Sequence, residues 1–106
     1  MLGVDIGGSK ILVVVVKNNK IVKKLKTPLV KKTKEEIIST VINSIKTFKE
    51  KRVGVCVPGI YEKGRIIKTP NLPCLNNFHI KEFLEKRTKV KVLLENDANC
   101  FALGEY

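Results

Sequence analysis

The sequence has very few of the residues that build metal centres and disulfide frameworks. Its 106 residues include one histidine, His79, and three cysteines, Cys56, Cys74 and Cys100. The cysteines are odd in number, and no two of them form a C-x-x-C pair. Because a structural zinc site needs a set of closely spaced Cys or His ligands, the sequence predicts no zinc site. An odd number of cysteines with no C-x-x-C pair suits free thiols in a reducing compartment, so we expect the protein to be cytoplasmic.

Long apolar segments are missing as well. No apolar run reaches the roughly 20 residues that a membrane-spanning helix requires. The first residues do not resemble a secretory signal peptide, because no positively charged stretch precedes an apolar one. We therefore expect no membrane association.

Acidic residues are scarce relative to basic ones. There are 21 Lys and Arg against 10 Asp and Glu, which gives a formal net charge of +11. This excess fits a nucleic-acid partner, an acidic substrate such as a nucleotide, or a solvated lysine-rich surface. The lysines are spread along the chain and are not interleaved with aromatic residues as in single-strand binders, which favours the solvated surface and disfavours nucleic acid.

What the sequence does contain is enough apolar material for one domain covering residues 1–106, since 43% of the residues are hydrophobic. Apolar runs predict strands at residues 1–4, 11–16 and 21–27, with a polar turn at residues 17–20 and Pro28 closing the third strand. Thr33 begins a helix, and Thr33 and Glu36 have the spacing of a capping box. The helix repeats apolar residues with helical period: Ile37, Ile38, Val41, Ile42, Ile45 and Phe48.

The second half alternates strands with helices. We predict a strand at residues 52–57, a ribbon at 60–67 that turns at Lys63 and Gly64, and a rigid loop at 69–73. A short helix with Ile80, Phe83 and Leu84 follows, then a strand at 90–94 and a helix that starts at residues 95–97 and runs to Tyr106. This order predicts an α/β fold, a mixed sheet covered by helices.

A glycine turn joins the first two predicted strands: Asp5, Ile6, Gly7, Gly8, Ser9 and Lys10. Glycines let backbone N–H groups approach an anion closely, because no Cβ stands in the way. The Ser9 hydroxyl is a further donor, and Asp5 can hold Mg²⁺ through water. This is a candidate phosphate loop, although a plain hairpin turn explains the glycines equally well.

Polar or glycine residues follow three apolar strands directly, at residues 7–10, 58–59 and 95–99. Ligands gather at the carboxyl ends of strands in such sheets, so we expect these loops to converge. Asp97 is a candidate proton acceptor for a substrate hydroxyl, with Asn96 beside it as a hydrogen-bonding partner; the alternative is a helix N-cap. Asn71, fixed between two prolines, is a candidate hydroxyl ligand or a simple loop residue.

These motifs together resemble the amino-terminal half of the ROK family (repressors, open reading frames and sugar kinases). The resemblance rests on residues 4–10, 54–59, 69–73 and 95–105 in the same order and covers almost the whole chain. It implies a ribonuclease-H-like, actin-like ATPase fold with a mixed five-stranded sheet flanked by helices. It also implies ATP-dependent phosphorylation of glucose, another hexose or an N-acetylhexosamine, with ATP and Mg²⁺.

The resemblance also implies a role for each matching residue. Asp97 matches the family's catalytic base, and the sugar-binding positions correspond to Gly59, Asn71, Asn96 and Asp97. The ATP phosphate and magnesium positions correspond to Asp5, Gly7, Gly8, Ser9 and Lys10. Ser9 stands where the family usually has Thr, and the hydroxyl is retained.

Family members are much longer, and their second lobe supplies a second phosphate loop and the adenosine pocket. We therefore expect this chain to be one lobe of a two-lobed kinase, working as a homodimer or with a complementary second lobe. It should be inactive alone. The alternatives are a non-catalytic regulatory or sugar-binding module of the same fold and, third, a basic nucleic-acid-binding domain. No recognisable nucleic-acid motif supports the last.

Overall fold

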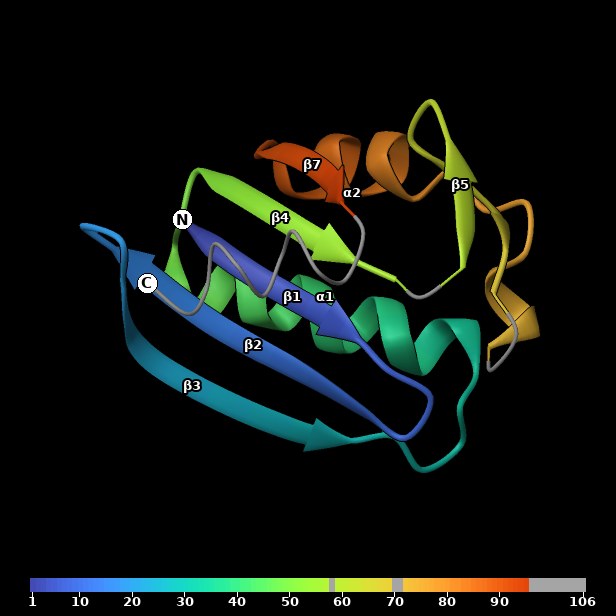
Figure 1. Ribbon diagram of the computed structural model, residues 1–106, viewed down its shortest axis with the longest axis horizontal. Coiled ribbons are helices and arrows are strands. Elements are labelled where there is room, and N and C mark those ends of the chain that lie inside the picture. Colours follow the sequence, from blue (N-terminus) through green and yellow to red (C-terminus); the bar gives the residue numbers. More distant parts are fainter. Residues whose placement is uncertain (58, 70–71, 96–106) are drawn as a thin grey trace.

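The computed structural model describes residues 1–57, 59–69 and 72–95. Five strands form a mixed sheet in the order β3-β2-β1-β4-β7, and β5 and β6 form a separate ribbon. Figure 1 shows the five strands side by side, with α1 behind them. The elements in chain order are β1 Leu2–Ile6, β2 Lys10–Lys17, β3 Lys20–Pro28, α1 Lys34–Phe48, β4 Arg52–Cys56, β5 Ile60–Glu62, β6 Arg65–Lys68, the 3-10 helix η1 Pro73–Leu75, α2 Ile80–Thr88 and β7 Lys91–Glu95.

The first three strands form an antiparallel meander, as the sequence predicts. The predicted polar turn at residues 17–20 is confirmed: Lys17 and Lys20 pair, and the two residues between them turn the chain. These residues, Asn18 and Asn19, have φ of 53° and 62°. Two left-handed residues in succession are characteristic of the type I′ turn, whose twist matches that of the flanking strands.

The first strand is longer than the sequence indicates, and this corrects the predicted boundary at Val4. Asp5 pairs with Leu12 and with Cys56, and Ile6 pairs with Ile11. Ile6 is fully buried, so extending the strand adds an apolar side chain to the core. The phosphate-loop candidate is therefore a three-residue turn at residues 7–9, with Asp5 inside β1 and Lys10 at the start of β2.

Helix α1 begins where predicted, but its capping differs. The Thr33 side chain accepts a hydrogen bond from the Glu36 N–H at 3.2 Å, which is one half of a capping box. The Glu36 carboxylate reaches further back, and it accepts from the N–H groups of Val30, Lys31 and Lys32 at 2.8–3.0 Å. These bonds lower the pKa of Glu36, and they attach the incoming chain to the first turn of the helix.

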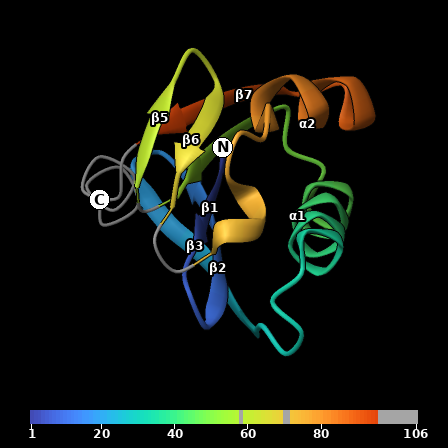
Figure 2. The same cartoon turned by 90° about the vertical axis from the view of Figure 1, so that its right-hand side faces the viewer.

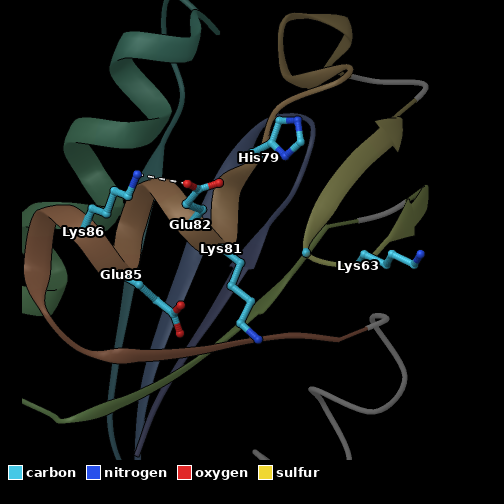
Figure 3. A pocket seen from close by; sticks show the side chains of 7 residues that line it. Lys63, His79, Lys81, Glu82, Glu85 and Lys86 are labelled. Carbon is cyan, nitrogen blue, oxygen red and sulfur yellow. Dashed lines mark ion pairs between the residues drawn. The ribbon is translucent and has the colours of Figure 1, made fainter.

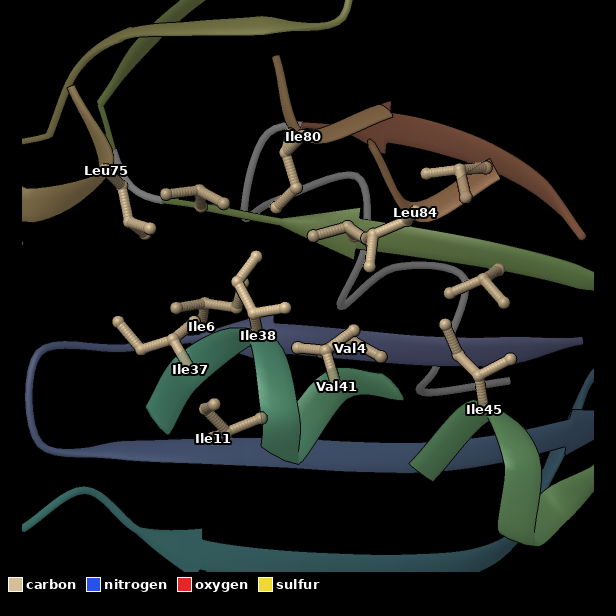
Figure 4. Close-up of a cluster of buried hydrophobic side chains, with 14 of the residues drawn as sticks. Val4, Ile6, Ile11, Ile37, Ile38, Val41, Ile45, Leu75, Ile80 and Leu84 are labelled. Carbon is tan, nitrogen blue, oxygen red and sulfur yellow. The ribbon is translucent and has the colours of Figure 1, made fainter. Parts of the chain in front are cut away.

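The core lies on one face of the sheet. Leu2, Val4 and Ile6 of β1 point to this face, and Gly3 and Asp5 point to the other. Figure 2 shows α1 and α2 on the same side of the sheet. Figure 4 shows the resulting apolar cluster, in which Leu75, Ile80 and Leu84 complete the layer formed by the residues of β1, β2 and α1.

Three strands of the sheet run parallel, which positions the loops that follow them. β4 pairs with β1 on one side and with β7 on the other, both in parallel. Cys56 lies opposite Asp5 and Glu95 in register, so the carboxyl ends of β1, β4 and β7 meet at one edge. This confirms that the chain leaves the sheet three times at the same edge. The predicted helix from residues 95–97 to Tyr106 lies outside the described residues beyond Glu95.

The predicted ribbon, short helix and last strand are confirmed with small changes in length, and residues 70 and 71 of the predicted loop at 69–73 lie outside the described residues. The β5–β6 ribbon turns at Lys63 and Gly64, both with positive φ, of 52° and 79°. The short helix is α2, which buries Ile80 and Leu84 and ends at a left-handed residue, Lys89. Figure 1 shows the ribbon beyond the carboxyl end of β4.

Candidate functional site

The turn between β1 and β2 is closed and anchored on both sides. The Gly7 N–H donates to the Lys10 carbonyl at 2.9 Å, and the Leu29 N–H donates to the Ser9 carbonyl at 2.9 Å. A Cβ at Gly7 would lie 3.1 Å from the Lys10 carbonyl oxygen, which leaves little room for a side chain. The turn therefore has a fixed shape before any ligand binds.

Two backbone donors of the turn are available to an anion. The N–H groups of Gly8 and Ser9 make no hydrogen bond within the part of the chain that the structure describes. The Gly7 amide is used by the turn itself, so two of the three amides at residues 7–9 are left for a phosphate. Ser9 and Lys10 are exposed, and their hydroxyl and ammonium groups are accessible at the same place.

Asp5 lies next to this turn, on the sheet face opposite the helices. It is half-buried, and its neighbours in register are Leu12 on β2 and Cys56 on β4. A carboxylate at the end of a central strand, two residues before a turn with open amides, is well placed to receive a hydrated cation that accompanies a phosphate. The structure thus brings Asp5, Gly8, Ser9 and Lys10 together, as the sequence predicts.

Gly59 lies where the chain leaves β4, and only glycine fits there. Its φ is +136°, a conformation that side-chain-bearing residues rarely adopt. A Cβ at this position would collide with the Lys68 carbonyl and would come within 2.9 Å of the Thr69 Cα. Two segments of backbone, after β4 and after β6, are therefore in direct contact.

Thr69, at the start of the loop predicted at residues 69–73, is a buried polar residue. It is 1% exposed, and its Oγ1 has no hydrogen-bond partner within residues 1–57, 59–69 and 72–95. Its N–H donates to Asn76 Oδ1 at 2.9 Å, which fixes the backbone immediately before Pro70. The predicted loop and motif at residues 69–73 include Thr69, but nothing in the sequence predicts that its side chain is buried.

Three of the predicted site residues lie outside the described residues. These are Asn71, Asn96 and Asp97. The structure does place β7, the strand that precedes Asn96 and Asp97, because this strand ends at Glu95 beside Cys56 of β4. The roles expected for these residues stay predictions.

A hollow of about 330 Å³ lies elsewhere, between α2 and the turn of the β5–β6 ribbon. Glu82 pairs with Lys86 at 2.9 Å, which lowers the Glu82 pKa, and Glu85 accepts from the Val92 N–H at 3.0 Å. Figure 3 shows the Lys63 ammonium pointing away from His79 and Lys81. The side chains do not converge on a common point, and none of the predicted site residues lines this hollow.

Neither a metal cluster nor a membrane span occurs in the described part of the chain. No group of three His, Cys, Asp or Glu residues there is arranged to hold a metal ion. The helices of residues 1–57, 59–69 and 72–95 are too short or too polar to cross a bilayer.

The chain is similar in sequence to curated sugar kinases. The chain is 38% identical over 113 residues to a glucokinase of Thermotoga maritima, with 99% of this chain and 36% of the relative covered. It is 35% identical to an N-acetyl-D-glucosamine kinase of Haemophilus influenzae, with 97% of this chain and 36% of the relative covered. The chain therefore spans about 36% of the length of these relatives.

Solved structures show the same fold. A ROK family glucokinase from Streptomyces griseus, in complex with glucose and AMPPNP, superposes with a TM-score of 0.81 at 29% identity, over 93% of this chain and 33% of that one. A Bacteroides thetaiotaomicron protein with an actin-like ATPase fold matches at a TM-score of 0.57 and 10% identity, which is a likeness of fold alone. The mixed five-stranded sheet is thus part of an actin-like ATPase fold, as the sequence predicts. The family model for ROK matches residues 1–106, and the chain belongs to the ROK family.

Proposed function

We propose that residues 1–106 form one lobe of an ATP-dependent sugar kinase whose acceptor is glucose or N-acetylglucosamine. The observation that carries this proposal is the closed turn at residues 7–9, with two open amides beside Asp5 on the outer face of the sheet. The relatives named glucokinase and N-acetyl-D-glucosamine kinase support the choice of acceptor. The Streptomyces griseus complex with AMPPNP supports ATP as the donor.

The phosphate end of ATP is the ligand that the turn fits. The Gly8 and Ser9 amides and the Ser9 hydroxyl would donate to phosphate oxygens, and Lys10 would neutralise charge. The donor set beside the turn suits Mg²⁺, because the carboxylate of Asp5 offers the hard oxygen ligands that this cation prefers. Magnesium would offset the negative charge of the phosphates.

The sugar would bind where the chain leaves β4, β6 and β7. Gly59 lies at the first of these exits with its backbone exposed, and Asn71 and Asn96 follow the other two. Asp97, two residues after β7, would accept the proton of the reacting hydroxyl as the phosphoryl group arrives. We further propose a cytoplasmic enzyme that works as a homodimer or with a complementary second lobe.

A chimaera tests this proposal directly. Residues 1–106 replace the matching segment of the Thermotoga maritima glucokinase, and ADP release is followed with glucose, mannose and N-acetylglucosamine. We expect turnover with glucose or N-acetylglucosamine that Asp97→Asn lowers by about 10²–10⁴-fold in kcat. Glu82→Gln makes the same chemical change on the exposed face of α2 and should leave kcat unchanged.

Folding of the chimaera is checked by thermal unfolding, and sugar affinity is measured separately by titration calorimetry. Asp97→Asn should leave sugar affinity within a few-fold, because the amide keeps the shape of the side chain. A chimaera that unfolds cooperatively and phosphorylates none of the three sugars would overturn the proposal. A near-normal kcat in Asp97→Asn would show that Asp97 is not the catalytic base, and it would leave the kinase assignment intact.

A further inference from the structure

We propose that Lys24 and Lys26 of β3, together with Lys10, bind a chain of linked phosphates that extends from the turn at residues 7–9 across the outer strands of the sheet. The inference rests on the proposed function, because it takes the turn as the place where a phosphoryl donor binds. It adds a second region of donor contacts on a strand that none of the sequence motifs includes.

The strand register places these lysines on the face that carries Asp5. Leu12 pairs with Asp5 on one side and with Lys26 on the other, so the three residues form one row across β1, β2 and β3. Val14 pairs in the same way with Gly3 and with Lys24, which forms the next row. Because residues paired across a ladder point to the same face, Lys24 and Lys26 share the face of Asp5.

The intervening residues of β3 confirm this alternation. Lys23 has its ammonium 6.0 Å from the centroid of the Phe48 ring, which belongs to α1 on the opposite face. Leu25 and Thr27 line a hollow of about 220 Å³ together with residues of α1. The lysines of β3 are therefore divided between the two faces, and only Lys24 and Lys26 accompany Asp5.

The spacing suits a chain of phosphates better than a single one. Neighbouring strands lie about 4.8 Å apart, so Lys26 is about 10 Å from β1, and alternate residues along β3 are about 6.8 Å apart. A single phosphate at the turn would reach Lys10 only. An anion that contacts the turn, Lys26 and Lys24 together must be extended and must carry charge along its length.

The three lysines are free to bind such an anion. Lys10, Lys24 and Lys26 are all exposed. The ion pairs found within the described residues, Glu82–Lys86 and the amino terminus with Glu50, involve none of the three. Asp5 is the acidic residue that shares their rows, at the far end from Lys26.

Linked phosphates fit this surface better than single-stranded nucleic acid does. Binding of single strands depends on aromatic side chains on which bases stack. The residues of β2 between these lysines and β1 are Leu12 and Val14, and the aromatic Phe48 lies on the other face. The surface thus provides positive charge but no aromatic rings on which bases could stack. This suits a phosphate chain such as the tail of a nucleoside triphosphate or inorganic polyphosphate.

Calorimetric titration of the 106-residue chain tests the inference, with orthophosphate, tripolyphosphate, long-chain polyphosphate, ATP and a single-stranded oligonucleotide as probes. The test variant is Lys24→Ala/Lys26→Ala. The matched control is Lys20→Ala/Lys23→Ala, which removes the same charge from the same strand. Thermal unfolding confirms that both variants fold.

We expect the test variant to bind tripolyphosphate about tenfold more weakly than the wild type, the effect of losing two exposed ion pairs. The control should stay within about twofold. A larger loss for long-chain polyphosphate than for ATP would identify polyphosphate as the favoured ligand, and equal losses would identify the triphosphate tail. Orthophosphate binding should respond to neither variant.

Three results would overturn the inference: no binding of any phosphate chain, equal losses in both double variants, or tighter binding of the oligonucleotide than of polyphosphate. Its failure is distinguishable from failure of the proposed function. An active chimaera with unchanged tripolyphosphate binding in Lys24→Ala/Lys26→Ala would leave the kinase assignment intact. An inactive chimaera with selective loss in that variant would leave the proposed binding of linked phosphates by Lys10, Lys24 and Lys26 intact.

Discussion

The backbone carbonyl of Lys68 occupies the space that any side chain at residue 59 would need, and Gly59 meets it with a φ of +136°. This contact joins the exit of β4 to the exit of β6. The segment after β6 precedes Asn71, one of the proposed sugar-binding residues. β4 also pairs with β7, which precedes Asn96, so the contact lies next to both of these residues in the chain.

Gly59→Ala should therefore damage stability as well as binding. The new Cβ would force the backbone of residues 68 and 69 to move, and a non-glycine residue at this φ is strained in addition. We expect the free energy of unfolding, measured in urea, to fall by ~1–3 kcal/mol. Lys68→Ala is the control, because it keeps the carbonyl and removes only an exposed side chain, at a cost of no more than about 0.5 kcal/mol. An unchanged unfolding midpoint in Gly59→Ala would show that the close contact is absent in solution.

Glu36→Gln should lower stability in a way that depends on pH. The three N–H groups that bond the carboxylate hold the pKa of Glu36 below its ordinary value in the folded protein. A depressed pKa contributes stability above the unfolded pKa of roughly 4.3, and this contribution disappears as the pH falls through the lower folded pKa.

Urea unfolding at pH 7 and at pH 3 measures this effect. At pH 7 we expect a lower midpoint for Glu36→Gln than for Glu35→Gln, whose carboxylate lies in the same helical turn. As the pH falls to 3, the difference between Glu36→Gln and the wild type should shrink. A difference that stays constant between the two pH values would contradict the ionic origin of the effect.

Thr69→Val should be neutral or stabilising. The Thr69 hydroxyl is buried without a partner in the described part of the chain, and valine replaces it with a methyl group of the same shape. Removing an unsatisfied polar atom from the interior should leave the free energy of unfolding unchanged or raise it by about 1 kcal/mol. Thr69→Ser keeps the hydroxyl and loses the methyl group, so it should cost about 0.8 kcal/mol. Marked destabilisation by valine would mean that the hydroxyl has a partner in the folded protein.

The sequence predicts the elements of this fold well where periodicity is strong. The spacing of Ile37, Val41 and Ile45 identifies the buried face of α1, and the alternation of Ile11, Val13 and Val15 identifies the buried face of β2. The boundary of β1 was wrong, because Asp5 belongs to the strand only through pairing with Leu12 and Cys56. Pairing between distant segments cannot be read from local residue patterns.

Only part of the candidate site could be predicted, because the sequence shows local structure and does not show contacts between distant segments. The glycine turn and Asp5 are adjacent in sequence, so their proximity follows from local structure. The burial of Thr69 was not predicted, although the motif at residues 69–73 includes it, because the segment after β6 lies against Gly59, which is distant in the sequence. The use of the Gly7 amide within the turn was also missed, since that bond needs the Lys10 carbonyl to point inward. Asn71, Asn96 and Asp97 remain predictions from the motifs that contain them.

The 106-residue chain by itself should give no measurable sugar phosphorylation, whereas the chimaera should. In this chain the proposed phosphate contacts Ser9 and Lys10 are exposed, and so is the proposed sugar contact Gly59. Phosphates bound there stay hydrated, and water competes with the sugar as acceptor. Positioning of two reactants in an enclosed site accounts for ~7–11 kcal/mol of a reaction barrier, and one wall of a site provides little of it.

The comparison is made at equal protein concentration with the same ADP-release assay, with and without sugar. We expect the isolated chain to match the protein-free background with every sugar, and to bind ATP and glucose more weakly than the chimaera does. Because the chimaera contains the same residues 1–106, the difference isolates the contribution of the surface that faces this sheet across the bound substrates. Sugar-dependent turnover by the isolated chain would show that residues 1–106 build both walls of the site, as two copies of the chain associating through the Asp5 face would do.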